Sequence, residues 1–407
     1  MLNVAGDEWL LRDRRVPARF QPMVSTDMRL TLADNRIAVT GTLDEPLTDR
    51  DVIRVAIAHD LRGVAGHADL FVDGITFDEQ LQPEMVSNIA LGIIANTRGS
   101  VAGTGRIDWT ANGVTSSTGR FRSDSLNFAA AFGPVTGLSG EIVFNDLLGL
   151  TTGPGQVVRL AQVNPGFAVN GGTIRYQLLP DFRMQVEGGE WPFAGGRLLL
   201  DPAVIELVSE APRNLVFRVD RIDAAQFLAG FDFKNINATG IFTGIIPIVF
   251  DKDGGHVRGG RLEVIGDGGT LAYVGELTYE DLGTMANFAF NALRSLRYKY
   301  LIIELDGDLA GEVVTRIRFD GLSQGEGASR NFLTRQVEKL PLQFNVTISA
   351  PFLQLITSAR SLYDTQYITD PAVLGLLPGQ ANNPDTDLPK TTGAEPGIQP
   401  PESEDRP

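Results

Sequence analysis

The sequence has no cysteine and only three histidines, His59, His67 and His256. Without cysteine, the chain forms neither disulfide bonds nor thiolate metal sites, and this absence fits a periplasmic protein as well as a cytosolic one. His59 and His67 have no acidic residue at a fixed spacing, which is typical of loop and strand-end histidines rather than of metal ligands. The sequence therefore predicts no metal site.

Long hydrophobic runs are also missing. The longest, such as residues 245–250 and 301–305, are far shorter than the roughly 20 apolar residues of a membrane-spanning helix. The opening residues, MLNVAGDEWLLRDRR, lack the basic start, apolar block and small-residue cleavage site of a signal peptide. We expect the chain to be the C-terminal portion of a longer protein that carries its anchor or signal upstream.

Positive charge is scarce. Lysine and arginine number 35 against 50 aspartates and glutamates, which gives a net charge of −15 and a pI of about 4.7. A field of this sign repels phosphate backbones, so we predict no nucleic-acid partner. The glycine-rich segments at 103–105, 254–260 and 266–269 open no helix, and no G-x-x-x-x-G-K-[ST] motif occurs. The sequence therefore predicts no phosphate cradle and no cofactor.

Catalytic patterns are weak. GLSQG at 321–325 matches the G-x-S-x-G nucleophile elbow, but the histidine of such a hydrolase follows its serine, and all three histidines precede Ser323. Asp251 and Asp253 begin like a calcium loop, yet no twelfth-position glutamate follows, so a hairpin turn explains them better. We predict no catalytic residue and no enzyme, and keep a Ser323 hydrolase as a minor alternative.

Short strands and tight turns are abundant. The 45 glycines and 22 prolines separate apolar runs that alternate with polar residues, which is the period of a strand with one buried face. Asp34-Asn35 and Asn112-Gly113 are hairpin signals. A small residue followed by glycine precedes several strands and suggests one structural device repeated along a long sheet: Gly41, Gly103, Gly140, Gly240 and Gly307.

Helices are few. Apolar spacing predicts them near 82–96, from Asp223, over 279–296 and over 351–364. From residue 379 the sequence is rich in proline, glycine and acid, which is typical of a disordered tail. We divide the chain into an N-terminal sheet portion (1–130), a second β-domain (131–350), a helical region (351–378) and the tail (379–407).

Residues 217–275 have a recognisable order. A strand leads to a short helix, then to ATGIFTGIIPIVF, a turn, and GGRLEVIGDGGTLAY. This order resembles the YdbH-like branch of the AsmA/TamB superfamily of Gram-negative envelope proteins. The resemblance continues through LRYKYLIIELDGDLAGEVVTRIRFDG and LPLQFNVTISAPFLQLITS, and upstream in 137–172 and WPFAGGRLLLDP. It covers about 130–365, whereas residues 1–130 share only the strand character.

The resemblance implies a mainly β fold: a long curved antiparallel sheet folded into an open apolar trough, with a few short helices. It also implies a periplasmic conduit that moves phospholipids between the inner and outer membranes and supports outer-membrane biogenesis, anchored in the inner membrane in the full-length protein. An older label for the domain, dicarboxylate transport, would need a basic cluster that the sequence lacks. The alternative is a β-rich structural or adhesin-like interaction protein with a closed core.

The alternating strands supply the candidate site. Side chains two apart share a strand face, and we expect nine of them to line a lipid groove: Leu301, Ile303, Leu305, Val313, Ile317, Phe319, Phe344, Val346 and Ile348. The expected ligand is phospholipid acyl chains. An open sheet also leaves free edges, and the family suggests a small outer-membrane lipoprotein that adds a strand near residues 341–350.

Overall fold

The computed structural model describes the chain in segments. These are residues 2–6, 8–16, 18–87, 94–130, 133–164, 168–207, 211–230, 236–251, 254–273, 296–309, 312–320, 323–324 and 344–351. The chain separates into two compact units, residues 1–359 and 360–407, and the second unit lies outside the described residues. The expected domain boundaries stay a prediction.

Strands dominate the described residues. The first half contains β1 (Leu2–Ala5), β2 (Trp9–Leu11), β3 (Met23–Ser25), β4 (Arg29–Ala33), β5 (Arg36–Glu45), β6 (Arg50–Asp60), β7 (Ala65–Phe77), β8 (Ile94–Thr110), β9 (Gly113–Ala130), β10 (Gly133–Asp146), β11 (Thr151–Thr152) and β12 (Gln156–Val163). The second half contains β13 (Val169–Leu179), β14 (Arg183–Phe193), β15 (Gly196–Leu200), β16 (Ala203–Glu206), β17 (Arg213–Asp223), β18 (Ile236–Asp251), β19 (Gly254–Tyr273), β20 (Leu296–Tyr298), β21 (Tyr300–Asp308), β22 (Glu312–Asp320), β23 (Ser323–Gln324) and β24 (Phe344–Pro351).

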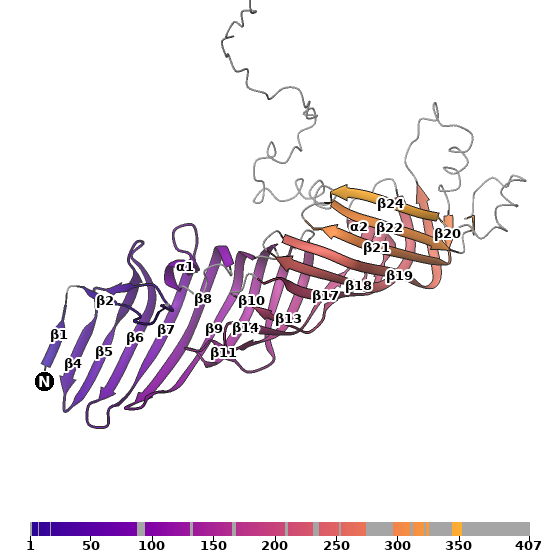
Figure 1. The fold of residues 1–407 in the computed structure, drawn as a ribbon. Coiled ribbons are helices and arrows are strands. Elements are labelled where there is room, and N and C mark those ends of the chain that lie inside the picture. Colours follow the sequence, from indigo (N-terminus) through magenta and orange to yellow (C-terminus); the bar gives the residue numbers. More distant parts are fainter. Residues whose placement is uncertain are drawn as a thin grey trace, which may run out of the picture. The chain divides into compact units, whose positions relative to one another are not determined.

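These strands form one antiparallel sheet in which each strand mostly pairs with its neighbours in sequence (Figure 1). Short strands share one long partner where a strand is interrupted: β3 and β4 on β5, β11 and β12 on β10, β15 and β16 on β14, and β20 and β21 on β19. No described strand near the N-terminus pairs with β24, so the sheet is not closed into a barrel. The expected mainly β fold, an open antiparallel sheet with short helices, is confirmed.

Tight turns connect the strands where the sequence indicates them. Asp34 and Asn35 both have positive φ, at 51° and 61°, between paired Ala33 and Arg36, which is the type I′ geometry of a two-residue hairpin. The hairpin expected at 112–113 is present one residue earlier: Thr110 pairs with Gly113, whose φ is +106°. Pairing of Asp251 with Gly254 likewise makes that segment a hairpin rather than a calcium loop.

Glycines mark the places where long strands change register. Gly140 and Gly240 have φ of +154° and +129° and sit at β-bulges, which bend a strand and increase its twist. Gly307 has φ +134°, opposite the bulge in β19. Gly41 and Gly103 serve another purpose, since an added Cβ would collide with the backbone of Met28, just before β4, and with the backbone of β9 respectively. The repeated glycine therefore has two structural uses, bending and close strand approach.

Two short helices are described. Helix α2 (Ala224–Gly230) follows Asp223, whose carboxylate accepts a hydrogen bond from the Gln226 N–H at 2.9 Å, so the acidic cap is confirmed. The helix expected over 82–96 was wrong in extent: α1 is a single turn (Pro83–Val86), because residues from Ile94 pair with β9 instead. The helix expected over 279–296 lies outside the described residues but for Leu296, which begins β20, and the one over 351–364 lies outside but for Pro351, the last residue of β24.

Candidate functional site

The candidate site begins on β21, where alternate side chains are apolar. Leu301 is 6% exposed, and Ile303 and Leu305 are partly buried. All three join Ile317 of β22 in one hydrophobic cluster. The structure therefore brings together four of the nine residues that the sequence selected.

The other five are placed by backbone register alone. Leu301 pairs with Phe319, and Phe319 pairs with Phe344. Ile317 pairs with Val346, whereas Ile348 pairs with Thr315. The side chains of Val313, Phe319, Phe344, Val346 and Ile348 lie outside the described residues, so their part in a groove stays a prediction.

The row of apolar residues that contains Ile303 extends far beyond the predicted set. Paired residues of an antiparallel sheet share a face, and the pairing continues across β24, β22, β21, β19, β18, β17, β15 and β14. In that order the row consists of Val346, Ile317, Ile303, Leu262, Gly244, Val219, Leu198 and Trp191. At about 4.8 Å between strands, it spans roughly 34 Å of sheet. We call it the central row.

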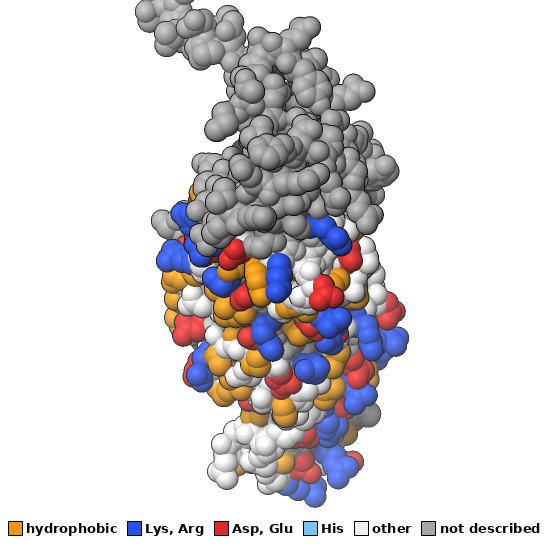
Figure 2. All heavy atoms as spheres, turned by 90° about the vertical axis from the view of Figure 1, so that its right-hand side faces the viewer, with side chains coloured by type: hydrophobic (Ala, Val, Ile, Leu, Met, Phe, Trp, Pro, Cys, Tyr) orange, Lys and Arg blue, Asp and Glu red, His pale blue; other side chains and the backbone are white. Residues whose placement is uncertain are grey.

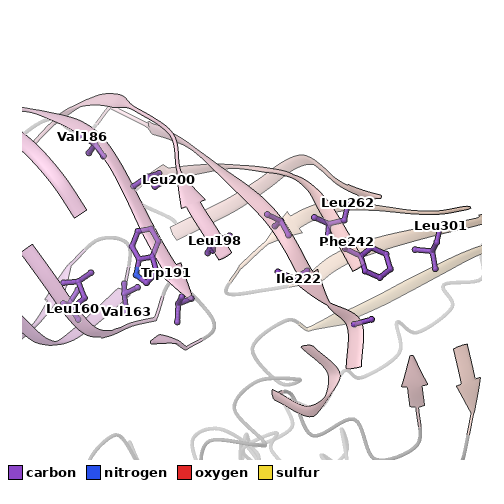
Figure 3. Packing of buried hydrophobic residues seen from close by; sticks show 14 of the residues in the cluster. Leu160, Val163, Val186, Trp191, Leu198, Leu200, Ile222, Phe242, Leu262 and Leu301 are labelled. Atoms are coloured by element: carbon purple, nitrogen blue, oxygen red, sulfur yellow. The ribbon is translucent and has the colours of Figure 1, made fainter. Parts of the chain in front are cut away.

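An apolar cavity of about 130 Å³ opens beside the central row, between strands β12 and β18. Figure 3 shows the Trp191 ring between Val186 and Leu200 above and Leu160 and Val163 below. The described residues that line the cavity are Leu160, Val163, Val169, Ile174, Met184, Val186, Trp191, Leu198, Leu200, Ile205, Arg213, Leu215, Phe217 and Phe250. Only Arg213 among them is charged, so the wall suits a hydrocarbon.

Glycine makes room for the indole ring of Trp191. A Cβ added to Gly172 would overlap the Nε1 atom of Trp191, and one added to Gly189 would lie 2.8 Å from its ring. The ring also contacts Phe217, with 6.2 Å between ring centroids. Trp191 was not among the residues predicted from the sequence, although the adjacent glycines 171–172 of β13 and 188–189 of β14 were a visible signal.

Two tyrosines bring neutral hydroxyl groups into this face. The Tyr298 hydroxyl, within the same cluster, donates a hydrogen bond to the Thr239 carbonyl oxygen at 2.6 Å. Burial raises the pKa of Tyr298 to about 12, and that of Tyr176 likewise to about 12. Both phenols therefore stay neutral at physiological pH.

The opposite face of the same strands is charged. Arg197, next to Leu198, forms ion pairs with Glu190 (3.2 Å) and Asp220, and Arg261, next to Leu262, approaches Glu304 at 3.7 Å. Figure 2 shows positive and negative side chains interspersed on the face that it displays. Exposed pairs of this kind contribute only about 0–1 kcal/mol each. They mark the solvent side of the sheet and leave the apolar side as the candidate site.

The described residues do not support a metal site built on His59 and His67. His59 pairs with Gly66 and His67 with Ala58, so adjacent registers place the two histidines on opposite faces. His59 Nδ1 accepts a hydrogen bond from Trp109 Nε1 at 3.2 Å. No group of three or more potential metal ligands occurs in the described part of the chain.

The Ser323 hydrolase alternative is also disfavoured by register. Ser323 pairs with Arg297, which pairs with Thr270 of β19. His256 lies fourteen residues earlier on that strand, roughly 45 Å along it. His256 instead bonds to Asp308 and Asp251, and the hydrogen bond with Asp308, followed by that with Asp251, raises its pKa.

In the described segments, no helix has the length and apolar character that crossing a bilayer requires.

Comparison with known proteins decides the family. The model of the YdbH-like family, described as intermembrane phospholipid transport protein YdbH, matches residues 3–373. The chain belongs to the YdbH-like family. This match begins well before residue 130, so it includes the N-terminal strands that the sequence analysis joined to the family only by their strand character. No curated protein and no solved structure matched the chain.

Membership connects the fold with a function at the level of the family. The YdbH-like family is one of lipid transport between membranes, which implies a location in the cell envelope. It is not a known family of enzymes, in keeping with the weak catalytic patterns of the sequence.

Proposed function

We propose that this chain is part of a periplasmic conduit that carries phospholipids between the inner and outer membranes along its apolar face. The observation that supports the proposal is the central row, whose described residues are apolar side chains and one glycine on the seven strands from β22 to β14. The reverse face is covered by ion pairs. This is the arrangement that a ligand with long hydrocarbon chains requires.

The energetics of lipid transfer explain why such a face suffices. Removing a CH₂ group from water is worth about 0.8 kcal/mol, so two acyl chains of about sixteen carbons represent roughly 25 kcal/mol. A continuous apolar lining offsets most of this cost without nucleophiles, metals or bound nucleotides. We also propose a location in the periplasm, with the protein anchored in the inner membrane.

Lipid mass spectrometry on natively purified protein tests the proposal. We expect diacyl phospholipid to remain bound after purification without detergent exchange, and the same protein to move a fluorescent phospholipid from donor to acceptor vesicles. A chain that is lipid-free after exposure to membranes, and that does not accelerate transfer, would overturn the conduit and favour the closed-core interaction protein.

We also propose a partner at the C-terminal end of the sheet. The last described strand, β24, pairs with β22 on one side, and no described strand pairs with its other side. An exposed strand edge accepts another strand through backbone hydrogen bonds. The partner proposed is a small outer-membrane lipoprotein, as the family resemblance suggests.

Two truncations separate this partner from other C-terminal contacts. Removing 341–407 deletes β24, whereas removing 360–407 deletes only the second compact unit. We expect capture of the lipoprotein, identified by mass spectrometry and confirmed with purified components, to be lost in the first truncation and kept in the second. Equal capture by both truncations would refute strand addition at β24.

A further inference from the structure

One histidine on the charged face of the sheet contacts two carboxylates at once. His256 lies near the start of β19, and its Nδ1 atom forms a hydrogen bond with Asp308, the last residue of β21. Its Nε2 atom lies 3.2 Å from the carboxylate of Asp251, the last residue of β18. The imidazole therefore joins the ends of three neighbouring strands.

Both hydrogen bonds form only when each ring nitrogen carries a proton. An ionised carboxylate accepts hydrogen bonds and donates none, whereas a neutral imidazole has one N–H donor and one bare nitrogen. A neutral His256 can therefore donate to Asp251 or to Asp308, but not to both. The bare nitrogen is then left facing a carboxylate oxygen, and that contact is lost.

The charged groups around the imidazole favour its protonated form. The hydrogen bond with Asp308 is the largest cause of a raised pKa for His256, desolvation opposes it, and Asp251 adds to the increase. Farther along β21, Asp306 is engaged by Arg316 at 3.2 Å. On β19 the next charged residue, Arg258, is exposed to solvent.

The neighbouring strand β18 adds no other charge among the described residues next to the histidine. There, the register partner of His256 is Val249, which in turn pairs with Asn214 of β17. Asp251 and Asp308 are therefore the carboxylates that respond directly to the charge of this imidazole.

The histidine lies directly behind a packed corner of the apolar face. Gly255 precedes it on β19, and the Leu309 N–H donates a hydrogen bond to the Gly255 carbonyl oxygen at 2.7 Å. On the apolar side, Phe250 and Leu309 pack over Gly255, where an added Cβ would lie 2.9 and 2.8 Å from their side chains. Phe250 also lines the apolar cavity. Loosening this corner therefore loosens one wall of the cavity.

We propose that His256 is a pH-sensitive clasp, which fastens β18 and β21 to β19 when the imidazole is protonated and releases one of them when it is neutral. The inference goes beyond the proposed function and stands without it. Because the pKa of His256 is raised in the folded protein, the stabilisation is complete below the ordinary value of 6.5 and is lost as the pH rises through the raised value. The corner at Phe250 and Leu309 is therefore held more tightly in mild acid than in mild alkali.

Hydrogen exchange of the full chain, followed by mass spectrometry, tests the clasp. Rates are divided by those of the unfolded peptides, which removes the intrinsic pH dependence of exchange. Between about pH 6 and pH 9, we expect about two- to fivefold faster exchange in the peptides that contain Phe250 and Leu309, a modest change because Asp308 is 58% exposed. Peptides of the β4–β5 hairpin serve as the internal control. Unchanged exchange at the corner, or an equal change in the control hairpin, overturns the proposal.

Asp308→Asn isolates the role of the proton. Asparagine has both a donor and an acceptor, so its amide can donate to the bare Nδ1 atom of a neutral His256 while the Nε2 N–H group donates to Asp251. We expect exchange at the corner to become independent of pH in this variant. The pKa of His256, measured by NMR titration of isotope-labelled histidine, should lie above 6.5 in the unmodified chain and fall in the variant.

A second histidine supplies the matched control. His59 accepts a hydrogen bond from Trp109 and not from a charged partner, so His59→Gln should keep the pH profile of the unmodified corner. If Asp308→Asn loosens with pH as the unmodified chain does, the bond with Asp308 is not the pH-sensitive contact and the clasp is refuted. A His256 pKa at or below 6.5 in the unmodified chain would refute it independently of any variant.

Discussion

Replacing Ile303 with lysine is expected to remove most of the bound phospholipid, whereas the same replacement at Ile302 leaves it bound. Ile303 belongs to the central row between Leu262 and Ile317. Ile302 lies on the reverse face, where its register partners are Glu263 and Arg318. The two positions therefore differ in the face that they occupy and not in residue type or strand.

The expected effect is large because a charge in the central row interrupts the hydrocarbon path. Its ammonium group must be desolvated against the acyl chain, and burying an unpaired charge costs several kcal/mol. We expect lipid loading, measured by mass spectrometry, to fall at least about tenfold in Ile303→Lys. At Ile302 the added lysine would lie opposite Glu263, its register partner on β19. Surface substitutions of this kind usually alter the free energy of unfolding by about 0.5 kcal/mol or less.

Loss of lipid must be separated from loss of fold. Ile303 is only partly buried, so in the lipid-free protein a lysine stem can lie along the apolar surface with its ammonium group directed to water, which a bound acyl chain would displace. Circular dichroism and thermal melting of both variants check this. Should Ile303→Lys unfold, Ile303→Ser replaces it, since a neutral side chain still lowers the loading. Equal lipid in the Ile302 and Ile303 variants would contradict a conduit on this face.

Local signals in the sequence predicted much of the fold. Alternation over 301–319 identified the faces of β21 and β22, because side-chain direction in a strand depends only on residue parity. The turn at Asp34-Asn35 was predictable because both residue types tolerate positive φ. The helix predicted over 82–96 was too long, because apolar spacing does not reveal that Ile94 pairs with Ala130 of the next strand.

The candidate site was only partly predictable, because it depends on register between strands. The central row on β14–β19 requires the bulges near Gly240 and Gly259, which shift each strand against the next. A single sequence shows the glycines but does not show by how many residues the pairing of two strands shifts at each bulge. Likewise, the contact between Trp191 and Gly172 joins two strands whose pairing the sequence does not display.

Replacing Gly172 with alanine is expected to destabilise the protein by about 1–3 kcal/mol, the usual cost of overpacking a filled core. The new Cβ would overlap Trp191 Nε1, so the indole must leave its place between β12 and β18. Urea denaturation followed by circular dichroism measures the loss. Gly63→Ala is the control, because a Cβ there meets no atom within 4 Å.

A double-mutant cycle shows whether Trp191 is the reason for the glycine. In a Trp191→Val background the ring is gone, so Gly172→Ala should cost much less, with a coupling energy of about 0.5–3 kcal/mol between the two positions. Trp191→Val alone should be destabilising through its cavity. Because the alanine occupies space that the ring left, the double variant should be more stable than the two separate losses imply. Additive losses would mean that the backbone of β13, and not the indole, requires glycine at position 172. The shape of the cavity wall would then be determined by strand geometry alone.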